Sequence, residues 1–119
     1  MMTRRTDRVE DLLRTEISRL ILRDVSDPRV RLATVSEVNV SPDLKHASIK
    51  VSVLGEDDER QNTLDALQHA SGFIRARLAQ NLKRMRSIPQ LTFELDRRAE
   101  HSQHISDLLE TIHDQDESA

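Results

Sequence analysis

The chain has 119 residues with a formal net charge of −3 and no cysteine, tryptophan or tyrosine. Without cysteine it can form neither a disulfide nor a thiolate metal site, and its length suffices for one domain with one modest core. Its longest strongly apolar run, Leu20-Ile21-Leu22, is too short for a membrane span and no signal peptide is evident, so we expect a soluble, cytoplasmic protein.

Charge is unevenly distributed along the chain. Residues 1–93 contain 16 Lys and Arg against 13 Asp and Glu, whereas residues 94–119 contain 2 against 8. Fifteen of the 18 basic residues are arginine, the side chain suited to bidentate phosphate contacts, although genomic base composition can produce the same preference. We expect one domain over residues 1–113 and an acidic, disordered tail over residues 114–119.

The first predicted element is a helix. Apolar residues recur at helical intervals from Val9 to Ile21. Asp7 is expected to begin this helix, with Glu10 three residues later in capping-box spacing. Asp27-Pro28 is expected to end it, because the residue before proline is steered out of the helical conformation.

Two strands are predicted next. Residues 34–40 indicate a strand whose phase changes between Val35 and Val38, as a bulge would allow. Ser41-Pro42-Asp43 is typical of a turn. Residues 47–53 then alternate between apolar and polar side chains, which indicates a half-buried second strand.

The remaining pattern predicts helices on either side of a third strand. After Gly55, residues 56–59 indicate a solvated loop and the acidic start of a second helix, whose apolar spacing continues through residues 64–70. Helical spacing follows again through residues 70–86, and Ile88-Pro89 ends it. Residues 91–96 alternate as a strand, and residues 105–112 form a short final helix. The expected order is α-β-β-α-α-β with a short C-terminal helix, an α+β fold with a three-stranded sheet.

The helix predicted over residues 70–86 is the most informative segment for function. Its apolar positions, from Ile74 to Met85, fall within one stripe. The rest of its circumference is basic and lacks any acidic residue: Arg75, Arg77, Lys83, Arg84 and Arg86. Such a face favours contact with nucleic-acid phosphates, the alternative being an ordinary solvated helix face.

Further candidates for RNA contact lie elsewhere in the chain. They are Arg4, Arg5 and Arg8 near the N-terminus, and Lys45 and Lys50 at the turn and on the second strand. Neighbouring carboxylates could neutralise the three arginines.

The shortage of aromatic residues excludes two common RNA-binding modules. An RRM or an OB-fold stacks bases on aromatic side chains, and this chain has only Phe73 and Phe93. The predicted order matches a type II KH domain, but Gly55 and Gly72 lie too far apart to form a GxxG loop. In its place stands Ala70-Ser71-Gly72, where Gly72 is expected to permit backbone geometry that a side chain would resist. A simple helix C-cap is the alternative.

Several short strings stand in a fixed order along the chain: Arg8-Val9, Asp27-Pro28-Arg29-Val30, Thr34-Val35, Val40-Ser41-Pro42-Asp43-Leu44, Ala70-Ser71-Gly72-Phe73-Ile74-Arg75 and Ile88-Pro89-Gln90-Leu91-Thr92-Phe93. With them the chain resembles the bacterial ribosome-binding factor A family, from about Arg8 to Ile112. In that KH-like family an Ala-x-Gly kink replaces the GxxG loop.

The resemblance implies a non-enzymatic ribosome assembly factor. Such proteins bind the 30S small subunit and its 16S rRNA rather than the complete ribosome, and they support late rRNA maturation and processing, particularly in the cold. By position, the five cations of residues 70–86 inherit the rRNA contact. We expect a monomer without a cofactor. An interaction module that has lost RNA binding is the alternative, and the salt dependence of RNA binding distinguishes the two.

Catalytic and metal-binding patterns are weak. His101, His104 and Asp107 have a spacing that could ligate a metal, but no fourth ligand accompanies them. The sequence offers no nucleophile beside a base and no phosphate-binding loop. We therefore expect neither a metal site nor an enzyme.

Overall fold

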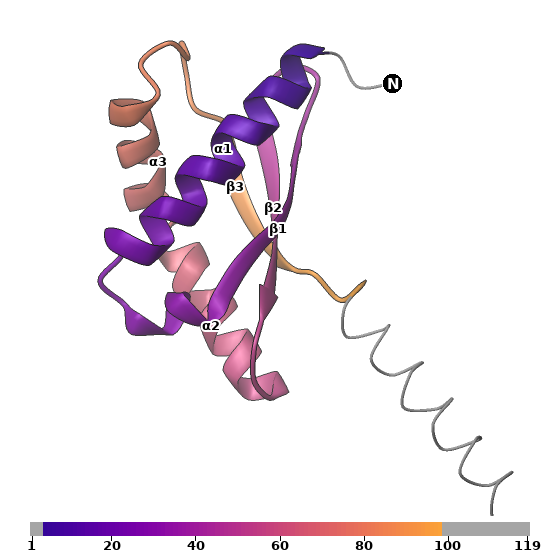
Figure 1. Cartoon of the computed structure of the whole chain (residues 1–119), viewed down its shortest axis with the longest axis vertical. Coiled ribbons are helices and arrows are strands. Elements are labelled where there is room, and N and C mark those ends of the chain that lie inside the picture. The colour runs from indigo at the N-terminus through magenta and orange to yellow at the C-terminus, as the bar shows by residue number, and fades with distance from the viewer. Residues whose placement is uncertain (1–3, 99–119) are drawn as a thin grey trace, which may run out of the picture.

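The computed structural model describes residues 4–98, in which helices and strands follow one another in the predicted order (Figure 1). Their bounds are α1 Arg4–Arg23, the 3-10 helix η1 Pro28–Leu32, β1 Ala33–Val40, β2 His46–Val53, α2 Asp57–His69, α3 Ser71–Asn81 and β3 Gln90–Leu95. The helix predicted over residues 105–112 and the tail predicted over residues 114–119 lie outside the described residues.

The three strands form one mixed sheet in the order β1-β2-β3. β1 and β2 are antiparallel, whereas β2 and β3 are parallel because α2 and α3 carry the chain back between them. The register of β1 shifts between Val35 and Glu37, so Ser36 is the extra residue of a β-bulge. The bulge buries both Val35 and Val38, and the predicted change of phase is confirmed.

One face of the sheet packs against the helices. Along β2 every second residue from Ala47 to Val53 is buried, as in a sheet covered on a single face. The stripe of α1 from Val9 to Ile21 packs over β1, and Leu67, Ile74 and Leu78 complete the core from α2 and α3. The fold is therefore a layer of helices on a three-stranded sheet (Figure 1).

The start of α1 differs from the prediction. The helix begins at Arg4 rather than Asp7, so Glu10 lies in its second turn. Glu10 is buried, and its carboxylate accepts a hydrogen bond from the Val40 backbone N–H at 2.7 Å. The carboxylate expected to serve its own helix instead ties α1 to the end of β1.

The end of α1 also differs. The helix stops at Arg23, before Asp27 and Pro28 are reached. Asp27 caps η1, because its carboxylate accepts a hydrogen bond from the Arg29 backbone N–H at 3.0 Å. Pro28 thus begins a short helix rather than ending a long one.

Ala70 separates α2 from α3. Its φ of −83° and ψ of −2° are right-handed, and its N–H bonds to the Ala66 carbonyl at 3.0 Å. Gly72 lies inside α3, and a Cβ placed there would meet no atom within 4 Å. Among residues 4–98 the glycine with a left-handed φ is Gly55, at 118°. The expectation that Gly72 provides a geometry closed to other residues is therefore wrong.

Candidate nucleic-acid interface

α3 is shorter than the helix predicted over residues 70–86. It ends at Asn81, and Leu82 leaves the helical conformation with φ −107° and ψ 63°. The Met85 N–H then bonds to the Leu82 carbonyl at 3.0 Å and turns the chain. Leu82 and Met85 still pack against the core, so the apolar spacing that predicted a longer helix is satisfied by a folded-back loop. Residues 82–89 are this loop.

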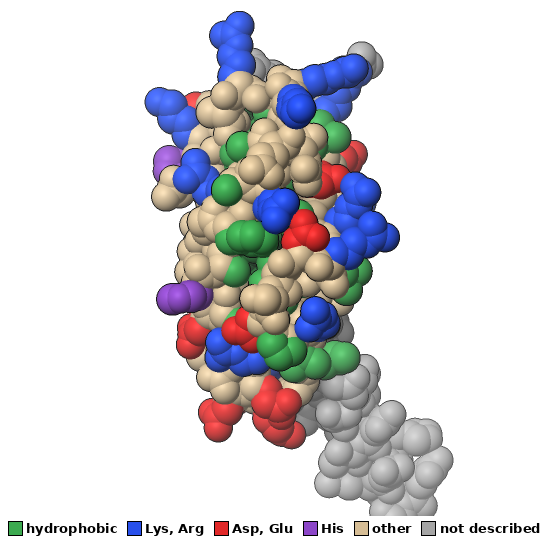
Figure 2. Space-filling view, turned by 90° about the vertical axis from the view of Figure 1, so that its left-hand side faces the viewer, with side chains coloured by type: hydrophobic (Ala, Val, Ile, Leu, Met, Phe, Trp, Pro, Cys, Tyr) green, Lys and Arg blue, Asp and Glu red, His purple; other side chains and the backbone are tan. Residues whose placement is uncertain are grey.

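The shorter helix moves Lys83, Arg84 and Arg86 onto the loop, where they join other cations at one end of the molecule. The loop, the β1–β2 turn and the first half of α1 lie at this end (Figure 1). We call the surface formed by these three segments the basic end. Its exposed cations are Arg8, Lys45, Lys83, Arg84 and Arg86. Within residues 4–98 none of these five forms an ion pair. Figure 2 shows blue side chains gathered at this end and acidic ones at the opposite end, where α2 begins.

Arg75 lies below this surface rather than on it. Its Nε donates to the Pro89 carbonyl at 3.0 Å, and its Nη2 donates to the Ile88 carbonyl, also at 3.0 Å. Both acceptor residues are buried. Arg75 therefore fastens the end of the loop to α3, and its guanidinium is engaged within the protein.

The β1–β2 turn holds Lys45 in place. Leu44 has a left-handed φ of 62°, and its N–H bonds to the Ser41 carbonyl at 2.8 Å. The Asp43 carboxylate accepts hydrogen bonds from the Ser41 hydroxyl at 2.6 Å and the Lys45 N–H at 3.0 Å, which lower the pKa of Asp43. The Lys45 carbonyl accepts the Gln90 N–H at 2.8 Å. The backbone of Lys45 is thereby hydrogen-bonded on both sides.

A hollow of about 440 Å³ opens among the three segments of the basic end. It is lined by Val9, Asp43, Leu44, Lys45, Arg84, Met85, Arg86 and Ser87. The site thus combines an aliphatic wall with three cations and one carboxylate, a composition of net positive charge that suits an anionic ligand with an apolar part.

The other predicted cations have different surroundings. Arg77 is exposed, and its guanidinium carbon lies 5.3 Å from the centre of the Phe73 ring, a cation–π contact. Lys50 pairs with Glu37 at 3.5 Å. The side chains of Arg4 and Arg5 are outside the described structure, so their RNA contact stays a prediction. The trio at positions 101, 104 and 107, at which we expect no metal site, also lies outside the described residues.

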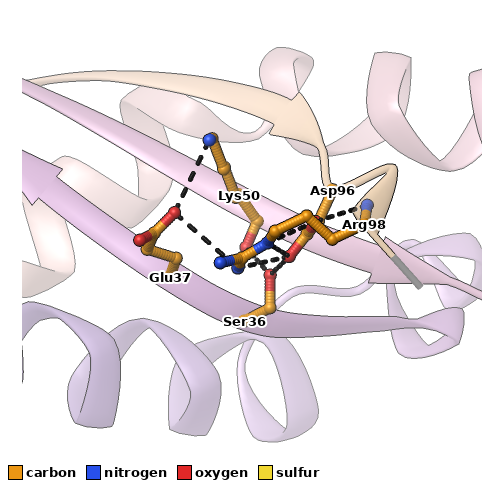
Figure 3. Close-up of polar contacts among 5 residues, drawn as sticks. All are labelled: Ser36, Glu37, Lys50, Asp96 and Arg98. Carbon is orange, nitrogen blue, oxygen red and sulfur yellow. Dashed lines mark hydrogen bonds and ion pairs between the residues drawn. The ribbon is translucent and has the colours of Figure 1, made fainter. Parts of the chain in front are cut away.

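Lys50 belongs to a polar network on the sheet, shown in Figure 3. The Ser36 hydroxyl, at the bulge, donates to Asp96 Oδ2 at 2.6 Å, and Arg98 holds the same carboxylate through Nε and Nη2. Arg98 also approaches Glu37 at 3.7 Å. The hydrogen bonds from Arg98 and Ser36 lower the pKa of Asp96. The network joins β1 to the end of β3, and Lys50 is neutralised within it.

A second hollow, of about 290 Å³, lies beside Ala70 at the predicted kink. It is lined by Asp24, Val25, Ser26, Asp27, Ala66, His69, Ala70 and Phe73. Its charged groups are mainly carboxylates, and the Asp27 pKa is lowered by hydrogen bonds from Arg29. The kink is therefore a poorer site for phosphate than the basic end.

The element order, the sheet topology and the interrupted helix pair define a KH-like α+β domain of the second type that lacks the GxxG loop. Between residues 4 and 98, no helix is both long enough and apolar enough to cross a membrane. The chain matches the model of the Ribosome-binding factor A family over residues 5–109, and it belongs to that family.

Relatives that carry the family's name are similar in sequence over the whole chain. Ribosome-binding factor A of Thermomicrobium roseum is 43% identical over 122 residues, which cover 100% of this chain and 94% of the relative. The Halothermothrix orenii protein of the same name is 39% identical, with 99% of this chain and 96% of the relative covered.

Solved structures show the same fold. The crystal structure of ribosome-binding factor A from Thermus thermophilus has a TM-score of 0.68 and 31% identity over 78% of this chain and 97% of that one. A Thermus thermophilus homology model, fitted into a cryo-EM map of a 30S complex, has a TM-score of 0.54 and 32% identity over 71% of this chain and 92% of that one.

Sequence reasoning missed the hollow because its walls come from three separate segments. A local signal exists in the alternation of apolar and basic residues in Leu44-Lys45 and in Arg84-Met85-Arg86. The second string was not recognised as a site, because a helix over residues 70–86 would place Met85 on its buried apolar stripe.

Proposed function

We propose that this protein binds the 30S ribosomal subunit and contacts its 16S rRNA through the basic end. The observation that carries the proposal is a group of five cations without ion pairs at one end of a chain whose net charge is −3. Family membership supports a ribosomal partner, and the Thermus thermophilus relative fitted into a 30S complex supports the small subunit.

The contact is made chiefly with phosphates. The two arginines of the loop present planar groups that hold phosphate oxygens in pairs, and the lysines add point charges. Each neutralised phosphate releases condensed counterions, so affinity falls as salt rises. Recognition then depends on the shape of the folded rRNA, since the described surface offers few aromatic groups for reading bases.

The role that follows is non-enzymatic assistance to subunit assembly. The protein acts as a monomer in the cytoplasm and supports late maturation of 16S rRNA, including its processing and the growth of cells in the cold. These finer statements rest on the resemblance to the family. Deletion of the encoding gene should therefore cause precursor 16S rRNA to accumulate, more strongly at low temperature.

Co-sedimentation tests the proposal. Tagged protein is expected to enrich with free 30S subunits or their precursors on a sucrose gradient and to be depleted from 70S ribosomes. Equal occupancy of 30S and 70S particles would contradict it. Binding to 30S that is insensitive to salt would instead indicate attachment through a ribosomal protein, because phosphate neutralisation would then be absent.

A further inference from the structure

We propose that the hollow at the basic end holds one unpaired nucleobase of a single-stranded RNA segment. The base would lie against the aliphatic wall formed by Val9, Leu44 and Met85. The cations beside that wall, Lys45, Arg84 and Arg86, would bind the phosphates on either side of the base. The inference rests on the proposed function, which supplies the RNA partner.

The size and openness of the hollow suit a small flat group. A volume of about 440 Å³ falls within the range of small-molecule sites, roughly 300–1,000 Å³. A paired base in an A-form helix is stacked on both faces and cannot lay a face against a protein wall. An unpaired base at a loop, bulge or strand end can do so, and this selects single-stranded RNA.

The wall offers contacts that a base can use without an aromatic partner. Met85 brings a polarisable thioether, which makes favourable contacts with aromatic rings. Arg84 and Arg86 flank Met85 in the sequence. The planar guanidinium of an arginine can stack on a base as well as bind phosphate. Apolar and cationic groups therefore alternate along the loop, as the base and phosphates do along an RNA strand.

The turn on the facing side has the same alternation. Leu44, in the wall, is followed directly by Lys45, whose backbone is held by Asp43 and Gln90. A leucine with φ 62° is uncommon, and such backbone strain concentrates at functional sites. The Asp43 carboxylate has Oδ1 committed to the Ser41 hydroxyl and the Lys45 N–H. The turn thus presents Leu44 and Lys45 to the hollow, together with the Asp43 carboxylate that holds the turn.

Two RNA strands that differ only in their bases test the inference. Fluorescence anisotropy compares a uridine strand of about eight nucleotides, within the usual length of single-strand sites, with its abasic counterpart carrying the same phosphates. We expect the protein to bind the uridine strand about fivefold more tightly, a modest preference because the wall is not aromatic.

The variant Met85→Ala removes part of the wall and leaves all five cations in place. We expect it to bind the two strands equally, whereas Met85→Leu should restore the preference. The control Leu54→Ala, at a leucine 76% exposed beyond the far end of β2, should keep the fivefold preference. Circular dichroism melting of each variant checks that the domain remains folded.

The outcomes separate this inference from the proposed function. The inference is overturned if the protein binds both strands equally, if neither strand binds, or if Met85→Ala keeps the full preference. Each of these results leaves 30S binding standing on the gradient experiment. Conversely, a wild-type protein that prefers the uridine strand but does not bind 30S on the gradient would overturn the proposed ribosomal role alone.

Discussion

Arg75 supports the loop of the basic end, although its own guanidinium is bound within the protein. Its two hydrogen bonds to the Ile88 and Pro89 carbonyls connect α3 to the last residues of the loop. Those residues lead directly into β3, which pairs with β2. The loop is therefore anchored at its far end, and Arg84 and Arg86 project from a defined backbone.

Replacing Arg75 should loosen this anchor. We expect Arg75→Ala to lower the free energy of unfolding by about 1–2 kcal/mol, because two carbonyls lose charged donors. It should also weaken 30S binding while leaving the salt slope unchanged, since no phosphate contact is removed. Urea unfolding and binding at two salt concentrations measure both effects. Arg77→Ala, with a more exposed side chain, is the matched control, and equal stability of the two variants would refute the anchoring role.

The two glycines should respond to alanine in opposite directions. Gly72 is helical with open space around it, so Gly72→Ala should stabilise the domain by about 0.5 kcal/mol. Gly55 has φ 118°, and a Cβ there would come within 2.9 Å of Glu59 Oε2. Gly55→Ala should therefore destabilise it by about 1–2 kcal/mol. Thermal melting of both variants is the measurement, and destabilisation by Gly72→Ala would restore a special role for that glycine.

At the scale of elements, the network of Ser36, Asp96 and Arg98 joins the bulge of β1 to the end of β3 across β2 (Figure 3). Asp96 accepts from both partners, and its pKa is lowered by them. A carboxyl group with a lower pKa in the folded state stabilises the fold above its unfolded pKa of about 3.9. That contribution is lost as the pH falls from there toward the folded pKa.

The variant Asp96→Asn should therefore be less stable than the wild type at neutral pH, with a gap that narrows in acid. We expect the difference in the free energy of unfolding to be constant between about pH 5 and 7 and smaller at about pH 3. Urea unfolding across this range measures it. A gap of the same size at both ends of the range would show that the charge of Asp96 is unimportant.

The strands could be predicted from the sequence more fully than the helices. The strands and the bulge follow from local alternation, because each side chain's face depends on its immediate neighbours. Two contacts made by the helices could not be predicted, because their partners are distant in the sequence. Glu10 bonds to Val40, 30 residues away, and the loop after Asn81 is held by Arg75. Capping rules that consider only nearby residues cannot detect either contact.

At the scale of the whole molecule, the two ends differ in charge although the overall balance is slightly negative. Cations without ion pairs occupy the end formed by the loop, the turn and α1, while α2 begins with Asp57, Asp58 and Glu59 at the other end (Figure 2). Such separation should orient the domain on a polyanion and keep its acidic end away from the RNA.

The charge of the basic end was predictable, but its shape was not. The absence of acids from residues 70–86 identified Lys83, Arg84 and Arg86 as candidates from sequence. Their position beside Lys45 depends on the fold, which brings the loop and the turn together. The hollow between them has no counterpart in any single segment, and only tertiary structure reveals it.

The salt dependence of 30S binding is the most direct test of phosphate contact through the basic end. Five phosphate contacts at roughly −0.7 to −0.9 each predict a slope of about −3.5 to −4.5 for log affinity against log salt. Affinity should then fall roughly 100- to 500-fold between about 50 and 200 mM salt.

The decisive comparison is between two double variants of equal charge change. Arg84→Glu with Arg86→Glu should flatten the slope by about 1.5 units, because two phosphate contacts are lost. Arg23→Glu with Arg31→Glu, at exposed positions outside the basic end, should leave it nearly unchanged. If the first pair melts like the wild type and binds 30S with the wild-type slope, the RNA-facing surface lies elsewhere.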